Sequence, residues 1–219
     1  MRKKRYTLTP FLSLLLFTLL SASCGDDDNY VYPPVLTEFV DAHVNSDFYI
    51  DKIVTDQGET LLLENNVSAK ELQTDSYYRA LCMYERINTQ SNQAKAYSLK
   101  LVFSSTPIPS EKFIHGVKTD PLSVQSIWRG RNYLNIIVLP KAQNITHSYH
   151  FIEDSVVTRE SITKVYLKLY HDRNNDLEAY EQKTYLSVPL HSYSMQKGDS
   201  IYFRVNTYKE GLKTWKFAY

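Results

Sequence analysis

Hydrophobic and polar positions alternate along short runs for most of the chain, and residues typical of turns separate the runs. In the first half, this alternation predicts five strands, at residues 36–44, 48–55, 59–63, 77–87 and 96–104. Asn, Asp and Gly tolerate tight or left-handed backbone, and they gather between the runs. Residues 68–72 suit one helical turn. Five strands with one short helix are typical of a small closed barrel such as the OB-fold.

The second half alternates more clearly. At 165–170, Val and Leu positions face one way, while Tyr and Lys positions face the other. Similar runs occur at 122–129, 132–139, 146–154, 178–188, 201–206 and 215–219. About seven strands over ~100 residues predict an antiparallel β-sandwich.

Two prolines separate the halves. Pro107 and Pro109 cannot donate to a ladder, so they cannot continue a central strand. We therefore predict an all-β chain with an OB-like β-barrel domain at 36–106, a linker at 107–121 and a β-sandwich domain at 122–219.

The N-terminal segment has the pattern of an export signal. Basic residues at 2–5 precede an apolar run at 11–20 that is too short to span a bilayer comfortably. The following Ser-Ala-Ser-Cys resembles a lipobox, at which the signal peptide is removed before a lipidated cysteine. This predicts a signal peptide at 1–23 and lipidation of Cys24. An ordinary secretory signal with an accidental cysteine is the alternative.

Residues 24–35 predict a solvated tether, because the acidic run at 26–28 cannot pack. Acidic residues beside a lipidated cysteine resemble the surface-export signal of Bacteroidetes lipoproteins. We expect a cell-envelope protein whose partner is the outer membrane, through its lipid anchor. Outward-facing and periplasmic orientations both stay open.

Charge excludes one class of function. The chain has 25 Lys and Arg against 24 Asp and Glu, and four of the basic residues belong to the signal peptide. The mature chain therefore carries a net charge of −3 and lacks the basic excess of a sequence-independent nucleic-acid binder. With Cys24 lipidated, Cys82 has no disulfide partner, and we expect it to be a buried structural residue.

Several short motifs carry a family resemblance. They lie at 77–85 (YYRALCMYE), 127–128 (IW), 133–136 (YLNI), 167–172 (LKLYHD) and 198–201 (GDSI). Together with the acidic leader, they resemble NigD-like lipoproteins. The resemblance implies an N-terminal OB-like domain and a C-terminal β-sandwich. It also implies a link to bacteriocin immunity, the role proposed for the family's namesake, and it transfers no catalytic residue.

One segment has the spacing of a calcium loop. Asp172, Asn174, Asp176 and Glu178 place an oxygen ligand at every second position. However, Leu177 and Lys183 stand where an EF-hand needs Gly and Glu. An Asn- and Asp-rich hairpin turn explains the same residues without a metal, and we favour it.

Three familiar catalytic motifs are absent from the sequence. It lacks Gly-x-Ser-x-Gly, a phosphate-binding glycine loop and His-Glu-x-x-His. His147 and His150 are three positions apart in a predicted strand, so we expect them on opposite faces, which disfavours zinc. We predict no cofactor and no enzymatic activity.

Tyrosine is the compositional outlier, with 18 residues. Four are expected on outward strand faces, namely Tyr166, Tyr170, Tyr202 and Tyr208. Tyrosine suits recognition of a protein or glycan, but it also stabilises exposed cross-strand pairs. We predict a non-enzymatic binding protein with an immunity-like role, and the net charge favours a basic toxin as its partner. A glycan-binding or glycan-processing accessory protein is the alternative.

Overall fold

The computed structural model describes residues 34–87 and 91–219. The predicted signal peptide, Cys24 and residues 24–33 of the predicted tether lie outside the described residues. Within the described ranges, no helix is long and apolar enough to cross a membrane. The helices found there are two three-residue 3-10 turns, η1 (Ser110–Lys112) and η2 (His191–Tyr193).

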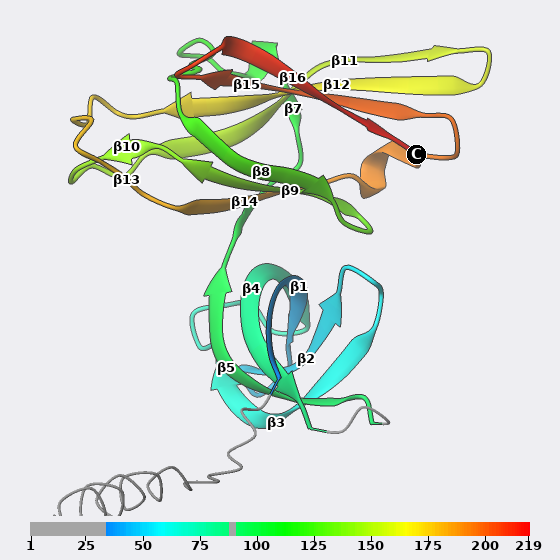
Figure 1. Cartoon of the computed structure of the whole chain (residues 1–219). Helices are drawn as coiled ribbons and strands as arrows, with labels where there is room; N and C mark the ends of the chain where they lie inside the picture. The colour runs from blue at the N-terminus through cyan, green and yellow to red at the C-terminus, as the bar shows by residue number, and fades with distance from the viewer. Residues whose placement is uncertain (1–33, 88–90) are drawn as a thin grey trace, which may run out of the picture. The chain divides into compact units, whose positions relative to one another are not determined.

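The first half forms a closed barrel with strand order β1-β2-β3-β5-β4 (Figure 1). Its strands are β1 (Val35–Val44), β2 (Tyr49–Thr55), β3 (Thr60–Ser68), β4 (Ser76–Arg86) and β5 (Gln93–Leu101). A parallel ladder between β3 and β5 closes the barrel, and the other four ladders are antiparallel. The closing ladder is short and pairs Leu62 with Gln93 and Leu63 with Ala94.

The barrel core consists of the inward positions of these strands and of Ala69, which follows β3. Its buried residues are Val40, Ala42, Val44, Ile50, Ile53, Leu61, Ala69, Ala80, Cys82, Tyr84, Ala94 and Ala96. Cys82 is completely buried, and burial raises the pKa of its thiol to about 12. Its position is that of a small core residue. Where we expected a helical turn at 68–72, β3 runs on to Ser68, and a single turn follows in which Leu72 donates to the Ala69 carbonyl.

The second half is a β-sandwich, and the all-β prediction is confirmed. One sheet has the order β16-β15-β12-β11-β7 and the other the order β6-β14-β9-β8. The main strands are β8 (Ser123–Arg129), β9 (Tyr133–Leu139), β11 (Ser148–Arg159), β12 (Ile162–Asp172), β14 (Thr184–Pro189), β15 (Ser200–Thr207) and β16 (Gly211–Ala218). A small ribbon pairs β10 (Lys141–Ala142) with β13 (Tyr180–Glu181).

Three ladders of the sandwich are parallel, whereas the sequence pattern suggested antiparallel pairing throughout. They join β12 to β15, β7 (Ile108–Pro109) to β11, and β6 (Phe103–Ser104) to β14. Residues 103–109 therefore contribute one short strand to each sheet. The segment 107–121, for which we expected a linker, contains β7 and η1 and ends with Thr119 bridging to His171.

The inward faces of the two sheets make one core. It is built from Leu122, Leu134, Ile136, Val138, Phe151, Val165, Leu167, Leu169, Leu186, Val188, Leu190, Ile201, Phe203 and Val205. Burial of these aliphatic and aromatic side chains explains the period-two pattern, because only every second residue of each strand reaches the core.

A buried arginine on the outer face of β4 is bound by two carboxylates of the barrel. Arg79 has a side chain that is only 1% exposed. Its Nη1 donates to Asp41 at 3.2 Å, and its Nη2 donates to both carboxylate oxygens of Asp56 at 2.7 and 2.9 Å. A buried charge requires such partners, since desolvation penalises an unpaired one.

The same guanidinium also contacts the sandwich. Its Nε donates to Ser187 Oγ at 3.2 Å, and its Nη2 donates to Asn135 Oδ1 at 3.0 Å. The guanidinium carbon lies 3.9 Å from the ring centre of Tyr133. Arg79 belongs to the motif at 77–85, and Tyr133 and Asn135 belong to the motif at 133–136. These two motifs therefore meet at a structural contact.

Candidate interaction surface

Two of the four tyrosines singled out from the sequence stack on the outer face of the five-stranded sheet. The parallel ladder between β12 and β15 sets Tyr166 opposite Tyr202. Their ring centres are 4.8 Å apart and the ring planes differ by 13°. On the other side of β15, the antiparallel ladder sets Lys216 opposite Tyr202, with its Nζ 5.7 Å from the ring centre.

Tyr170 shares this outer face, four positions along β12 from Tyr166. Its ring stacks on Phe113, which follows η1, with centres 4.8 Å apart and an interplanar angle of 18°. Phe113 therefore covers one face of the Tyr170 ring.

Tyr208 is placed differently. It follows β15 and packs against the sandwich core. Its hydroxyl accepts the backbone N–H of Lys141 at 3.4 Å, and burial raises the pKa of that hydroxyl. The structure thus brings three of the four predicted tyrosines to one face and assigns the fourth to the edge of the core.

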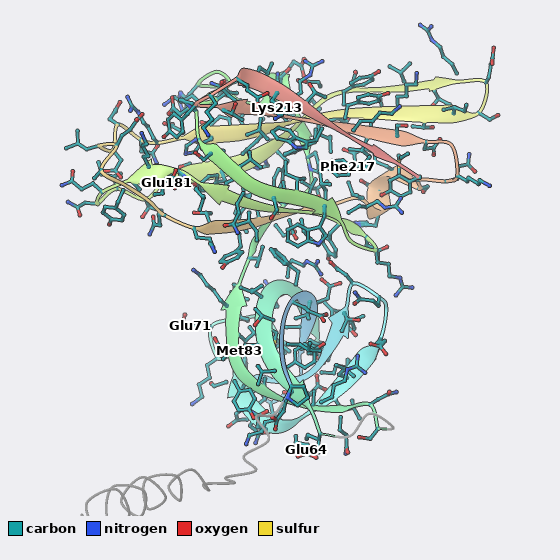
Figure 2. All side chains as sticks on the ribbon, viewed as in Figure 1. Glu64, Glu71, Met83, Glu181, Lys213 and Phe217 are labelled. Atoms are coloured by element: carbon teal, nitrogen blue, oxygen red, sulfur yellow. The ribbon has the colours of Figure 1, made fainter. Side chains whose placement is uncertain are left out.

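Cations accompany these tyrosines, and our sequence reasoning did not single them out as a surface. Lys164 and Lys168 alternate with Tyr166 along β12, Arg204 follows Tyr202 on β15, and Lys216 lies on β16. Figure 2 labels Lys213 and Phe217, which lie on the opposite side of β16 from Lys216. The sequence did contain a signal for this surface, because all four cations occupy outward positions of the period-two pattern.

A hollow of about 510 Å³ opens at the β11–β12 hairpin, next to the stacked tyrosines. Its lining residues are Val157, Arg159, Glu160, Ile162, Lys164 and Tyr166. Ile162 is 44% exposed, so the hollow offers an apolar wall beside charged residues. A hollow of this size accommodates a few side chains of a ligand.

The four candidate calcium ligands, for which we favoured a turn without a metal, do not converge on one point. Asp172 accepts from Lys118 Nζ at 2.6 Å, and this contact lowers the pKa of Asp172. Glu178 pairs with Arg173 at 3.0 Å. Each of these two carboxylates therefore has a separate cationic partner within the protein.

The other two candidates hold neighbouring backbone. Asp176 accepts the N–H groups of Gln143 and Asn144 at 2.6 and 3.2 Å, and backbone hydrogen bonds lower its pKa to about 2. Asn174 has a left-handed φ of 54° and donates to the Thr146 carbonyl. Over residues 34–87 and 91–219, no three His, Cys, Asp or Glu side chains come together as metal ligands would.

A buried histidine pair lies beside this turn, and the sequence reasoning missed it. His147 comes just before β11, and its Nδ1 lies 2.9 Å from His171 Nε2 on β12. His171 Nδ1 donates to the Asp120 carbonyl, so in the neutral ring its Nε2 accepts from His147. Burial lowers the pKa of His171, which favours that neutral ring. His147 Nε2 is then left 3.5 Å from Asp176 Oδ2.

Comparison with known proteins identifies the family. The model of the NigD-like C-terminal beta sandwich domain matches residues 104–219, which is more than half of the chain. The chain belongs to the NigD-like family. This confirms the resemblance seen in the sequence motifs. No curated protein matches the chain.

Solved structures agree with this family assignment. A NigD-like immunity protein from Bacteroides caccae is 31% identical, with a TM-score of 0.70 over 86% of this chain and 99% of its own. A protein of unknown function from Bacteroides vulgatus is 18% identical, with a TM-score of 0.66 over 84% and 90%. A protein from Bacteroides fragilis proposed to be a lipoprotein is 13% identical, with a TM-score of 0.59 over 84% and 96%. The last two show a shared fold only.

Proposed function

We propose that this NigD-like chain is a lipid-anchored recognition protein of the cell envelope that protects its own cell as an immunity protein does. The similarity that carries the proposal is the one to the Bacteroides caccae NigD-like immunity protein, which spans nearly the whole of both folds. The outer face with Tyr166 and Tyr202 supports a recognition role, since a standard interface needs only ~800 Å² from each partner.

The anchor in this proposal is Cys24, attached to the outer membrane. More than one acyl chain on one residue makes a stable anchor, because each buried CH₂ contributes ~0.8 kcal/mol. Cells grown with labelled palmitate should label the wild-type protein and the Cys82→Ser variant equally, and should leave Cys24→Ser unlabelled. Label on Cys24→Ser would refute the anchor.

Protection is tested by deletion. If the chain confers immunity, cells without it should lose viability when exposed to a secreted toxin encoded beside its gene, and the plasmid-borne gene should restore survival. Equal survival of deleted and parent cells against every such toxin would refute the immunity role.

The proposed action is binding without turnover. A panel of glycosidase, esterase and peptidase substrates should therefore remain unchanged by the purified protein. Turnover that disappears with one carboxylate substitution would show that the chain is an enzyme.

A further inference from the structure

The outer face of β12, β15 and β16 carries a concentration of positive charge that the net charge of the chain conceals. Lys164, Lys168, Arg204 and Lys216 all lie on it, and we call it the basic face. One carboxylate, Asp154, serves two of them, at 3.0 Å from Lys168 and 3.8 Å from Arg204. These five side chains together have a local charge of +3, opposite in sign to the −3 of the mature chain.

The cations are crowded by the strand register. The parallel ladder sets Lys168 directly opposite Arg204, where like charges repel each other, and Asp154 offsets only one of the two positive charges. Lys164 and Lys216 are exposed, and neither has an ion-pair partner within the described residues. An anionic partner would relieve this repulsion while gaining charge-assisted hydrogen bonds.

The aromatic rings limit what kind of anion fits. Tyr166 and Tyr202 stack on each other, and Lys216 lies over Tyr202. Bases stack on aromatic residues through free ring faces, and the Tyr166–Tyr202 stack together with Lys216 occupies part of these faces. Neither tyrosine hydroxyl makes a hydrogen bond to another described residue, so both are available as donors to carboxylates.

The hollow favours a ligand that also carries an apolar group. Ile162 and Val157 line it beside Lys164 and Tyr166, within reach of the same ligand. A purely hydrophilic polyanion would leave this apolar wall in water, whereas a polypeptide can supply carboxylates and an apolar side chain together.

We propose that the basic face binds an acidic polypeptide segment, with carboxylates on Lys164, Lys168, Arg204 and Lys216 and an apolar side chain in the hollow. This inference rests on the proposed recognition role and specifies the partner's chemistry. It reverses the partner charge expected from composition, because a ligand meets the local field of one face rather than the sum over the chain.

The test uses a fluorescently labelled random copolymer of glutamate and tyrosine as the probe and follows its anisotropy with the purified protein. Binding should weaken as salt is raised from ~0.05 to ~0.5 M, since the screening length falls from over 10 Å to a few Å. The double variant Lys164→Glu/Lys216→Glu should bind about tenfold more weakly or worse. The variant Lys70→Glu/Lys183→Glu makes the same change in net charge at exposed sites elsewhere and should stay within about twofold of wild type.

The apolar contribution has its own variant. Ile162→Ser should weaken binding of the glutamate–tyrosine copolymer while leaving binding of polyglutamate unchanged. Equal effects on both polymers would refute insertion into the hollow.

Three results would overturn the acidic-polypeptide assignment. They are no binding of the copolymer, equal losses in the two double variants, and tighter binding of alginate or of phosphatidylglycerol vesicles than of the copolymer.

The survival assay separates this inference from the proposed function. If Lys164→Glu/Lys216→Glu protects cells as well as wild type, the assignment of the face fails and immunity stands. If wild type itself gives no protection, immunity fails, and the binding data still decide the face.

Discussion

Replacing the buried Arg79 by leucine should destabilise the protein by about 3 kcal/mol. The guanidinium is 1% exposed, and its two carboxylate partners are 21% (Asp41) and 16% (Asp56) exposed. Removing one member of a buried ion pair costs about 3–5 kcal/mol, because the remaining charge stays buried and unpaired. Since both carboxylates retain some contact with water, we expect the lower end of that range.

The loss should also depend on pH. Burial raises the pKa of Asp41, while Arg79 lowers it, so removal of Arg79 raises that pKa further. A carboxyl group with a raised folded-state pKa destabilises the fold at neutral pH and stops doing so as it becomes protonated. The difference between Arg79→Leu and wild type should therefore be smaller at about pH 5 than at about pH 7.

Urea unfolding measures this difference, with Arg86→Leu as the matched control on the same strand. Arg86 pairs with the half-exposed Glu59, and such surface pairs contribute about 0–1 kcal/mol. If Arg79→Leu costs no more than Arg86→Leu, or if its cost is unchanged between the two pH values, the argument about the buried charge is wrong.

Three further predictions test the fold. Burial raises the pKa of the Cys82 thiol to about 12, so this thiol should not react with maleimide at neutral pH in the native protein and should react fully in denaturant. Fast labelling of the native protein would contradict the burial of Cys82. Gly130→Ala should destabilise the protein by about 1–3 kcal/mol and lower its melting temperature, because the new Cβ would collide with the Asp56 carboxylate. The control Gly116→Ala places its Cβ where no atom lies within 4 Å, so it should cost only backbone strain. Backbone hydrogen bonds lower the pKa of Asp176 to about 2, so the stability that its carboxylate provides should be present above about pH 4 and disappear as the pH falls toward 2. The melting temperatures of wild type and Asp176→Asn should therefore converge over that pH range.

The sequence pattern predicted the strands well, because burial of one face leaves a period of two. The run at 165–170 is the middle of β12, and the run at 201–206 lies within β15. The parallel pairing of these two strands was not predictable in the same way. Alternation tells which side of a strand is buried, but the partner and direction of a ladder depend on how the whole sandwich closes.

The candidate site was predicted in part. Outward tyrosines at 166 and 202 follow from the pattern, but their stacking depends on the register between β12 and β15. The turn at 172–178 fits calcium spacing in the sequence. Its oxygens instead bind Lys118 and the backbone at 143–144, which are far away in the chain. The spacing of these side chains in the sequence does not reveal which distant groups bind their oxygens in place of a metal.

Arg79 illustrates the same limit. In the sequence it is one charged residue on an outward position of a strand, a place that normally faces water. Its partners Asp56 and Asn135 lie 23 and 56 positions away, and only the folded chain shows that they enclose it.

The direction of β1 and β5 has a mechanical consequence for a protein held by its N-terminal end. Both strands run antiparallel to β4, so they run parallel to each other. A pull that enters at the start of β1 and leaves at the end of β5 would slide these strands past β4 lengthwise. The ten residue pairs between β1 and β4 would then bear the load at the same time, instead of opening one after another. If the chain is anchored through its N-terminal end as proposed, the barrel would therefore resist unfolding when a load is applied along β1.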